Sequence, residues 1–282
     1  MVGFININKP VGKSSAFAVG RVKKLFGCPC GHMGTLDPMA SGVLPVGIGK
    51  ASRLFPYLLD KEKTYVAEFT FGYETDTLDD TGKKVSDGGR IPARAEIENA
   101  LPFFIGNIEQ IPPKFSAKCV DGKRGYELAR KGVDFTLSAK TVEISDFRLT
   151  EAKEGGAFSF EISCKGGTYI RSLCRDLAHK LGTKAVMTGL TRTKSGAFDL
   201  NNAMPFNELS DLKSAEKYII PADSVVDFEK LFLDKKTAEK IINGLFDDIG
   251  VKDGTYRVYN ETAFLGIGVA ENGVLKIKSY VR

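Results

Sequence analysis

The chain has 282 residues, of which 43% are hydrophobic and 27% charged, a balance that is typical of globular proteins and excludes a disordered or fibrous chain. Its 40 Lys and Arg residues outnumber its 35 Asp and Glu residues only slightly, so the charge permits a nucleic-acid partner without requiring one. Five cysteines, no signal peptide and no apolar run long enough for a bilayer predict a cytoplasmic protein with reduced thiols and no membrane contact.

The first predicted elements are a strand, a turn and a helix. Apolar and polar residues alternate over residues 5–8, which predicts a strand, and the Lys-Pro-Val-Gly run at 9–12 predicts a turn. Ser14 and Ser15 can cap the helix that follows, and Gly27 can end it because glycine tolerates a left-handed conformation. The apolar stripe of this helix is Ala18, Val19, Val22, Leu25 and Phe26.

The middle of the chain alternates strands with helices. We predict a short helical piece over 53–59, strands over 65–71, 142–149 and 158–164, and a helix over 169–181. In the strand at 158–164, apolar residues alternate strictly with polar ones, so one face should be buried and the other wet. Mostly antiparallel strands interrupted by helices indicate an α+β fold with a mixed, mainly antiparallel sheet, not a doubly wound parallel one.

Two later stretches differ in character. Residues 110–132 interleave basic residues with Phe115, Tyr126 and Leu128, which is typical of a basic arm that binds nucleic acid and, equally well, of a solvated surface helix with flanking loops. The basic residues are Lys114, Lys118, Lys123, Arg124, Arg130 and Lys131. Beyond Pro221 the chain changes to a short helix and several brief strands, which predicts two domains, 1–220 and 221–282.

A predicted loop over residues 28–41 contains Asp37, the acid best placed for chemistry. Gly34 allows unusual backbone angles, Pro38 restricts the backbone beside the acid, and Gly42 lets another segment approach closely. A rigid turn of this kind can hold Asp37 over a cleft. Taken alone, an Asp-Pro dipeptide more often marks a turn in which the Asp only caps the local backbone.

The run from Gly31 to Leu44, Gly-His-Met-Gly-Thr-Leu-Asp-Pro-Met-Ala-Ser-Gly-Val-Leu, resembles the catalytic motif of the bacterial tRNA pseudouridine-55 synthase family. Other segments of residues 1–200 are similar to that family in the same order. They are Asn8-Lys9-Pro10-Val11-Gly12 with Ser14-Ser15, Lys63-Thr64-Tyr65, Gly72 with Thr75-Asp76-Thr77, Asp80-Thr81-Gly82, Gln110-Ile111-Pro112-Pro113 with Phe115-Ser116-Ala117, and Lys165-Gly166-Gly167-Thr168-Tyr169-Ile170-Arg171. The C-terminal residues look like a PUA-type RNA-binding domain, although a small β-barrel of any function could share their short strands and glycines.

The resemblance implies that the protein isomerises one uridine in the T loop of transfer RNA to pseudouridine, with no metal and no organic cofactor. Asp37 matches the family's catalytic carboxylate, and Arg171 would keep it ionised and oriented through a charge-assisted pair. Tyr65 would stack on the target base, and its hydroxyl is a candidate for removing the C5 proton. Without the resemblance, Arg171 would be interpreted as a surface arginine and Tyr65 as an ordinary core aromatic.

Further residues are implied to bind the RNA. Tyr169 and Leu190 would line the base pocket, and His32 would occupy the space vacated by flipped nucleotides. Zinc ligation by His32 with Cys28 and Cys30 is a weaker alternative, because no fourth ligand is evident. The basic residues expected to contact the RNA are Lys9, Lys114, Lys118, Lys123 and Arg124.

The implied partner is the T-stem loop of transfer RNA, without a guide RNA, and we expect a monomer. A non-catalytic RNA-binding protein is the first alternative, and Asp37, Tyr65 and Arg171 argue against it. The second alternative is a guide-RNA-dependent synthase of the dyskerin type, and the terminal extensions that such proteins usually carry are the feature that would distinguish it. An Asp-dependent hydrolase would need a paired acid or base at a suitable spacing, and the sequence shows none.

Overall fold

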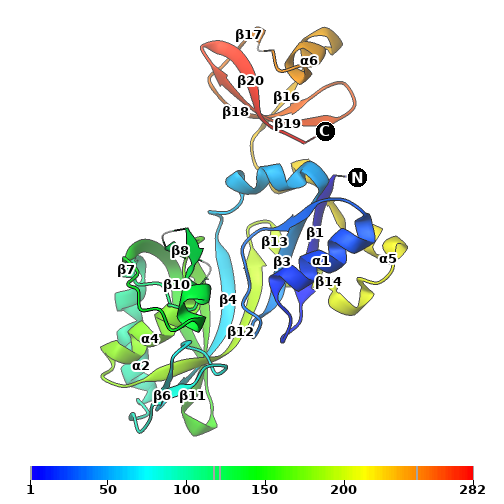
Figure 1. Ribbon diagram of the computed structural model, residues 1–282. Coiled ribbons are helices and arrows are strands. Elements are labelled where there is room, and N and C mark those ends of the chain that lie inside the picture. Colours follow the sequence, from blue (N-terminus) through cyan, green and yellow to red (C-terminus); the bar gives the residue numbers. More distant parts are fainter. Residues whose placement is uncertain (1, 117, 121, 246, 282) are drawn as a thin grey trace. The chain divides into compact units, whose positions relative to one another are not determined.

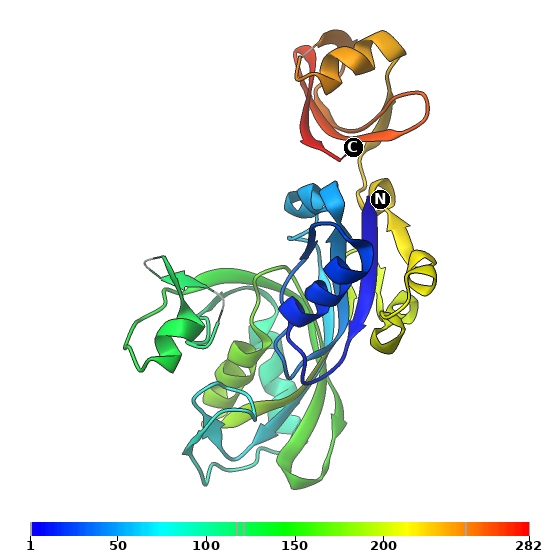
Figure 2. The ribbon, with the colours of Figure 1, turned by 45° about the vertical axis from the view of Figure 1, so that its right-hand side comes forward.

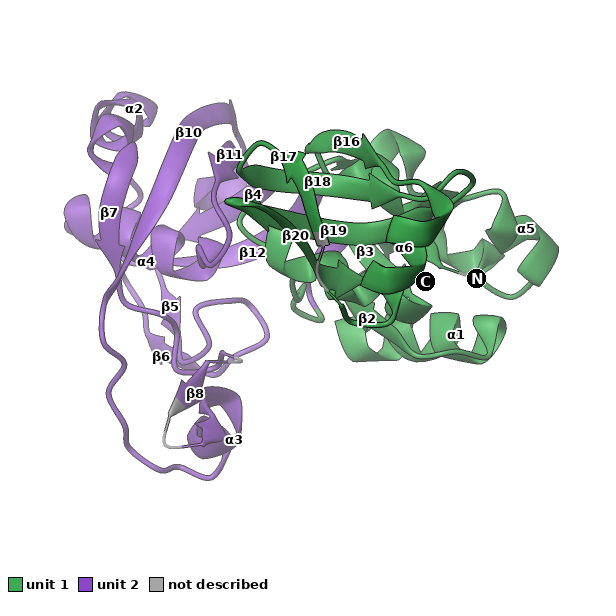
Figure 3. Ribbon diagram, turned by 90° about the horizontal axis from the view of Figure 1, so that it is seen from above, with its two compact units in different colours: residues 1–38, 42–60, 196–282 green, residues 39–41, 61–195 purple. Residues whose placement is uncertain are grey.

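The computed structural model describes residues 2–116, 118–120, 122–245 and 247–281 (Figure 1). The chain divides into two compact units (Figure 3): unit 1 comprises residues 1–38, 42–60 and 196–282, and unit 2 comprises residues 39–41 and 61–195. Among the described residues, no helix combines the length and the apolar character needed to cross a bilayer.

Unit 1 begins with an antiparallel strand pair. Strand β1 (Gly3–Lys9) pairs along its whole length with β3 (Ser41–Ile48), whose residues 42–48 are all buried. A short strand, β2 (Cys30–His32), lies inside the stretch expected to be a loop and pairs with β3. The other small elements of this part are η1 (Gly49–Tyr57), β13 (Phe198–Asp199), η4 (Leu200–Asn202), β14 (Met204–Pro205), η5 (Phe206–Glu208), α5 (Leu212–Glu216), β15 (Ile219–Pro221) and η6 (Ala222–Val225).

Helix α1 (Ser15–Phe26) forms where the sequence predicts it. The hydroxyl of Ser14 accepts a hydrogen bond from the Phe17 N–H at 3.1 Å, and Gly27 closes the helix in a left-handed conformation with φ 62°. Ser14 is therefore the capping residue, which leaves the Ser15 hydroxyl available for another contact. Ala18 and Val22 form the buried part of the predicted stripe, and its other three residues are half-buried.

Unit 2 is built on five antiparallel strands. Their order is β12 (Ala185–Ser195), β4 (Lys63–Phe71), β11 (Ala157–Cys164), β10 (Lys140–Ala152) and β7 (Gly106–Gln110). Helix α4 (Ile170–Lys180) packs against β12 and β4. The remaining elements are β5 (Glu74–Thr75), β6 (Lys84–Ser86), α2 (Arg94–Ala100), η2 (Leu101–Phe104), β8 (Cys119–Val120), β9 (Lys123–Arg124), α3 (Gly125–Arg130) and η3 (Glu154–Gly156).

Aromatic side chains fill the core of unit 2. Phe69 of β4, Phe160 of β11 and Phe147 of β10 contact one another, with ring centroids 4.7 to 6.4 Å apart. The predicted wet face of β11 is only partly wet, because Ser159 is 8% exposed. β11 lies between two strands, and Ser163 on its polar face hydrogen-bonds Thr64 of β4 at 3.1 Å. The polar side chains of this interior strand are thus partly covered by, and bonded to, side chains of the neighbouring strands.

The C-terminal residues form a separate five-stranded, curled sheet (Figure 2). Its order is β16 (Glu229–Phe232), β18 (Gly254–Tyr259), β19 (Phe264–Glu271), β20 (Gly273–Tyr280) and β17 (Asp247–Val251), and helix α6 (Lys235–Ile242) contacts β17 and β20. Val258, Leu265 and Leu275 lie in its own apolar cluster. The architecture agrees with the α+β fold and the small PUA-like barrel expected from the sequence, whereas the boundary at residue 221 stays a prediction.

Candidate active site

The backbone just before Asp37 is fixed by one buried hydroxyl. Ser15 accepts a hydrogen bond from the Leu36 N–H at 2.8 Å and donates one to the Leu36 carbonyl at 2.8 Å. Both residues are 2% exposed. Because the first turn of α1 thereby holds both polar groups of the preceding residue, the direction in which the chain enters Asp37 is determined.

The backbone just after Asp37 is fixed as well. The Pro38 carbonyl accepts a hydrogen bond from the Gly12 N–H at 2.7 Å and a long one, 3.5 Å, from the Lys9 ammonium. Lys9 is fully buried and also donates to the carbonyls of Pro10 and Lys13, at 2.8 and 2.6 Å. A buried ammonium needs acceptors around it, and here it positions the loop, while the expected RNA contact of Lys9 stays a prediction.

Asp37 itself is half-buried between these two anchors. Gly34 and Gly42 on either side adopt φ values of 87° and 98°, which L side chains rarely adopt, so glycine is needed at both positions. His32 lies on β2, half-buried, and the next residue, Met33, donates its N–H to the Pro45 carbonyl of β3 at 2.9 Å. The loop is therefore a fixed platform for a carboxylate.

Three of the predicted pocket residues come from adjacent elements of unit 2. Tyr65 lies on β4, 7% exposed, directly opposite Arg192 of β12 and Ile162 of β11. Leu190 lies on β12, half-buried, two positions from Arg192. Tyr169 is the N-cap residue of α4, which packs against β12 and β4. No pattern in the sequence indicated that Arg192 would be fully buried.

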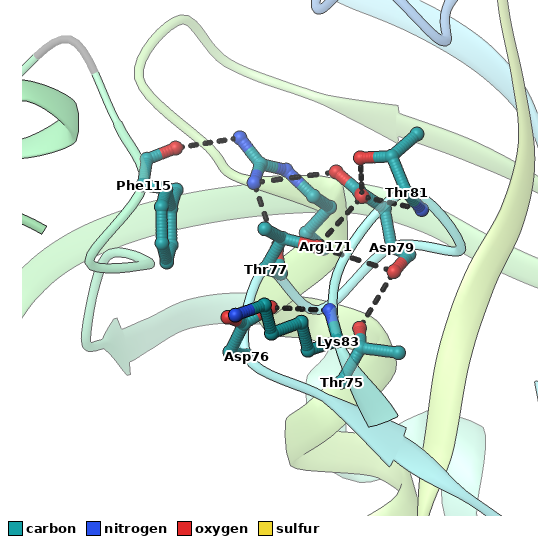
Figure 4. Close-up of polar contacts among 8 residues, drawn as sticks. All are labelled: Thr75, Asp76, Thr77, Asp79, Thr81, Lys83, Phe115 and Arg171. Atoms are coloured by element: carbon teal, nitrogen blue, oxygen red, sulfur yellow. Dashed lines mark hydrogen bonds and ion pairs between the residues drawn. The ribbon is translucent and has the colours of Figure 1, made fainter. Parts of the chain in front are cut away.

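Arg171 is a buried hub, 5% exposed (Figure 4). Its guanidinium donates to the carbonyls of Thr77 at 2.8 Å and Phe115 at 3.0 Å, and Nη1 lies 3.5 Å from a carboxylate oxygen of Asp79. Side-chain exposure of both members of that ion pair is 6%. The plain alternative, a routine surface arginine, is wrong. Asp37 belongs to unit 1 and Arg171 to unit 2, and an Arg171–Asp37 pair stays a prediction.

Asp79 is the residue of this group that the sequence analysis missed. Its Oδ1 accepts hydrogen bonds from the hydroxyls of Thr77 and Thr81, at 2.8 and 2.6 Å, and from the Thr81 N–H at 3.1 Å. Leu78 beside it has φ 63°, a conformation that a leucine adopts only when its surroundings impose it. Asp and Thr crowd residues 75–81, and that density was the signal available in the sequence.

The basic arm, residues 110–132, has a defined local structure in its described part (Figure 2). The N–H groups of Gly125 and Tyr126, at the start of α3, donate to the carbonyls of Lys118 and Ser116 at 2.8 and 3.0 Å. Lys123 and Arg124 of β9 are exposed. Two further arm cations have protein partners: Lys114 pairs with Asp134 at 2.8 Å, and Lys118 reaches the Ser138 carbonyl at 3.4 Å.

The weaker zinc alternative receives no support from the thiols. Burial, followed by the neighbouring Cys28, raises the pKa of the Cys30 thiol to about 11. The raised pKa makes it more costly to remove the thiol proton, which zinc ligation requires. Within the part of the chain that the structure describes, no three His, Cys, Asp or Glu side chains are grouped to hold a metal ion.

The fold and these residues define a class of protein, the pseudouridine synthases. A crystal structure of a Cbf5–Nop10–Gar1 complex is similar, with a TM-score of 0.71 and 26% identity over 98% of this chain and 79% of that chain. An H/ACA RNP bound to a substrate RNA containing 2'-deoxyuridine has a TM-score of 0.73 at 22% identity, over 99% of this chain and 85% of that chain, which supports the fold alone.

Sequence comparison specifies the family. Residues 23–170 match the N-terminal domain of the TruB family pseudouridylate synthases, and residues 171–227 match the tRNA pseudouridylate synthase B C-terminal domain. The tRNA pseudouridine synthase B of Caldanaerobacter subterraneus is 37% identical over 98% of both chains, and that of Clostridium novyi is 39% identical over 99% of both. The chain belongs to the TruB family of pseudouridylate synthases and is an isomerase.

Proposed function

We propose that the protein converts uridine 55 in the T loop of transfer RNA to pseudouridine, with Asp37 as the catalytic carboxylate. Relatives that match over nearly their full length are named tRNA pseudouridine synthase B, which supports transfer RNA as the substrate. The observation that carries the proposal is the catalytic motif around Asp37 and the anchoring of the loop on both sides of it, by Ser15 and by Gly12 with Lys9.

The reaction is an isomerisation with no net redox change. The C1'–N1 glycosidic bond breaks, the uracil turns, a C1'–C5 bond forms, C5 loses its proton and N1 gains one. Asp37 would either attack the sugar or the uracil as a nucleophile or remove a proton from the sugar. The pocket would retain the detached uracil meanwhile. Tyr65, buried on β4, would stack on the uracil, and its hydroxyl would take the C5 proton.

The target base has to leave the folded T loop to reach Asp37, and unstacking costs a few kcal/mol that protein contacts must offset. The exposed cations Lys123 and Arg124 would bind phosphates of the loop, which positions RNA without reading its sequence. His32 would fill the space that the flipped nucleotides leave, and Tyr169 and Leu190 would enclose the base.

We further propose that this single chain acts in the cytoplasm as a monomer, without guide RNA or added metal. The test is to incubate purified protein with an unmodified transfer RNA transcript and to map pseudouridine by chemical modification and reverse transcription. One stop at position 55, absent from a transcript with cytidine there, is the expected result. Stops spread over many uridines, or none, would refute the assignment of the site.

A further inference from the structure

Two side chains of helix α4 bond to one atom near the start of the basic arm, the carbonyl oxygen of Ile111. The Ser172 hydroxyl donates to this carbonyl at 2.8 Å, and Nη2 of Arg175 donates to it at 2.9 Å. Ser172 and Arg175 lie three positions apart and hence on one face of the helix. Ser172 is fully buried, and the Arg175 side chain is 17% exposed and bonded to Asp176 at 2.8 Å.

Main-chain bonding, not side-chain packing, fixes this point. The Ile111 side chain is 51% exposed, so apolar contacts contribute little to holding it. Pro112 and Pro113 follow, both buried, and each ring restricts φ. Because residues 112 and 113 are restricted in this way, the backbone direction at Ile111 also sets the position of Lys114, the first cation of the arm.

The same end of α4 carries two residues of the candidate active site. The Tyr169 N–H donates to the side-chain carbonyl of Gln110 at 2.8 Å, and Arg171 donates to the Phe115 carbonyl at 3.0 Å. Gln110 is 1% exposed. The segment from 110 to 115 is thus attached to α4 at three of its residues, alongside the guanidinium that is bonded to Asp79.

We propose that Ser172 and Arg175 are positioning residues, the Ile111 clamp, which hold the basic arm in register with Arg171 so that phosphate binding by the arm aligns the RNA with the pocket. This rests on the proposed function, in which the arm binds RNA. Releasing the clamp removes one of the three attachments of the 110–115 segment to α4 and so loosens the arm, and ordering it again on binding weakens the RNA complex. The Ile111 carbonyl, on an exposed residue, can then bond to water, so the fold survives.

The first experiment measures steady-state kinetics on the transfer RNA transcript for Ser172→Ala/Arg175→Met. We expect KM to rise about 5- to 10-fold, as the loss of two hydrogen bonds implies, with a smaller fall in kcat. A matched control, Arg94→Met/Ser210→Ala, removes an arginine ion pair and a serine-to-carbonyl bond far from the arm in sequence. Its KM should equal that of the wild type.

A double-mutant cycle shows whether the clamp acts through the arm. The second variant, Lys123→Gln/Arg124→Gln, removes two of the exposed arm cations and should itself raise KM. If the clamp serves the arm, adding the clamp substitutions to this background changes KM by less than about twofold. Effects that multiply would show that Ser172 and Arg175 act elsewhere, and would overturn the inference.

Limited proteolysis provides a readout that does not depend on activity. Trypsin cuts after Lys and Arg, and the arm offers six such sites between 114 and 131. In the clamp variant, cleavage there should be about tenfold faster than in the wild type, with unchanged cleavage elsewhere and an unchanged melting temperature. Equal cleavage rates would overturn the clamp. A wild type that fails to turn over would refute the proposed function, while the proteolysis result would still decide the clamp.

Discussion

At the scale of single residues, two neighbouring serines have different roles, and only one of them helps to position Asp37. Ser14 caps α1 and is exposed, whereas Ser15 is buried and bonds both polar groups of Leu36. The sequence showed only that both serines can cap the helix. Their division of labour depends on Leu36, 21 residues away, and local propensity carries no such information.

Substituting the two serines separately tests this division. Ser15→Ala leaves two buried groups of Leu36 without their partner, so it should destabilise the protein by about 1–3 kcal/mol and lower kcat at least tenfold. Ser14→Ala removes only a helix cap and should cost about 1 kcal/mol with kcat unchanged. Urea unfolding and single-turnover kinetics measure both quantities, and equal kcat values for the two variants would contradict the role of Ser15.

Asp79 allows a second comparison at this scale. Asp79→Asn keeps the shape and an acceptor for Thr77 and Thr81 but removes the negative charge beside Arg171, so turnover should fall at least tenfold while the protein stays folded. The control is Asp76→Asn, because Asp76 accepts an exposed hydrogen bond from the Lys83 N–H in the same segment. Similar turnover in the two variants would show that the Arg171–Asp79 pair does not serve catalysis.

At the scale of elements, strand pairing places ionisable side chains across neighbouring strands. Glu68 of β4 bonds Lys153, just beyond β10, and Thr188 of β12. The hydrogen bond from Lys153, followed by the one from Thr188, lowers the pKa of Glu68 below its ordinary value, and partial burial opposes this. A lowered folded-state pKa gives stability that is present above the unfolded pKa and is lost as pH falls through the folded one.

The resulting prediction is a small, pH-dependent stability difference. Compared with Glu68→Gln, the wild type should be more stable by less than about 1 kcal/mol at pH 6, because the groups are partly exposed, and this advantage should vanish as the pH falls below the usual range of a glutamate. Urea unfolding at several pH values measures it. An advantage that grew on acidification would have the wrong sign. Glu151→Gln, 3.9 Å from Lys153, serves as the control.

The sequence predicted elements whose pattern is local and missed those whose pattern depends on burial. Helices α1 and α4 and strands β4, β10 and β11 were expected within a few residues of where they lie. Strands β3 and β12 were not, because β3 is buried on both faces and contains Pro45, while β12 carries two register shifts and a buried arginine. Neither has the alternation that marks a half-buried strand.

At the scale of the whole molecule, the C-terminal sheet shares a core with the N-terminal strands of unit 1. Ile267 and Val281 belong to the same apolar cluster as Phe4, Val43 and Leu54. The short strands and glycines predicted the small C-terminal sheet correctly. The shared core was not predicted, because it joins residues from both ends of the chain and no local sequence pattern indicates such a contact.

Truncation tests this shared core. A fragment of residues 1–220 lacks Ile267, Val281 and the other members of this cluster beyond residue 220, and a large apolar side chain contributes up to about 1.5–3 kcal/mol when it is fully buried. The fragment should therefore melt at a lower temperature than the full chain and scatter light on heating. Leu275→Ala, inside the sheet's own cluster, should destabilise mainly the C-terminal strands. A fragment as stable as the full chain would show that the shared cluster contributes nothing.

We propose that Asp37 performs the isomerisation. The most direct measurement is tritium release from a T-stem loop transcript labelled at C5 of uridine, with wild-type protein and Asp37→Asn side by side and RNA affinity measured for both. We predict release of one tritium per RNA by the wild type and none by the variant, at equal affinity. Substantial release by Asp37→Asn would show that the isomerisation does not depend on this carboxylate.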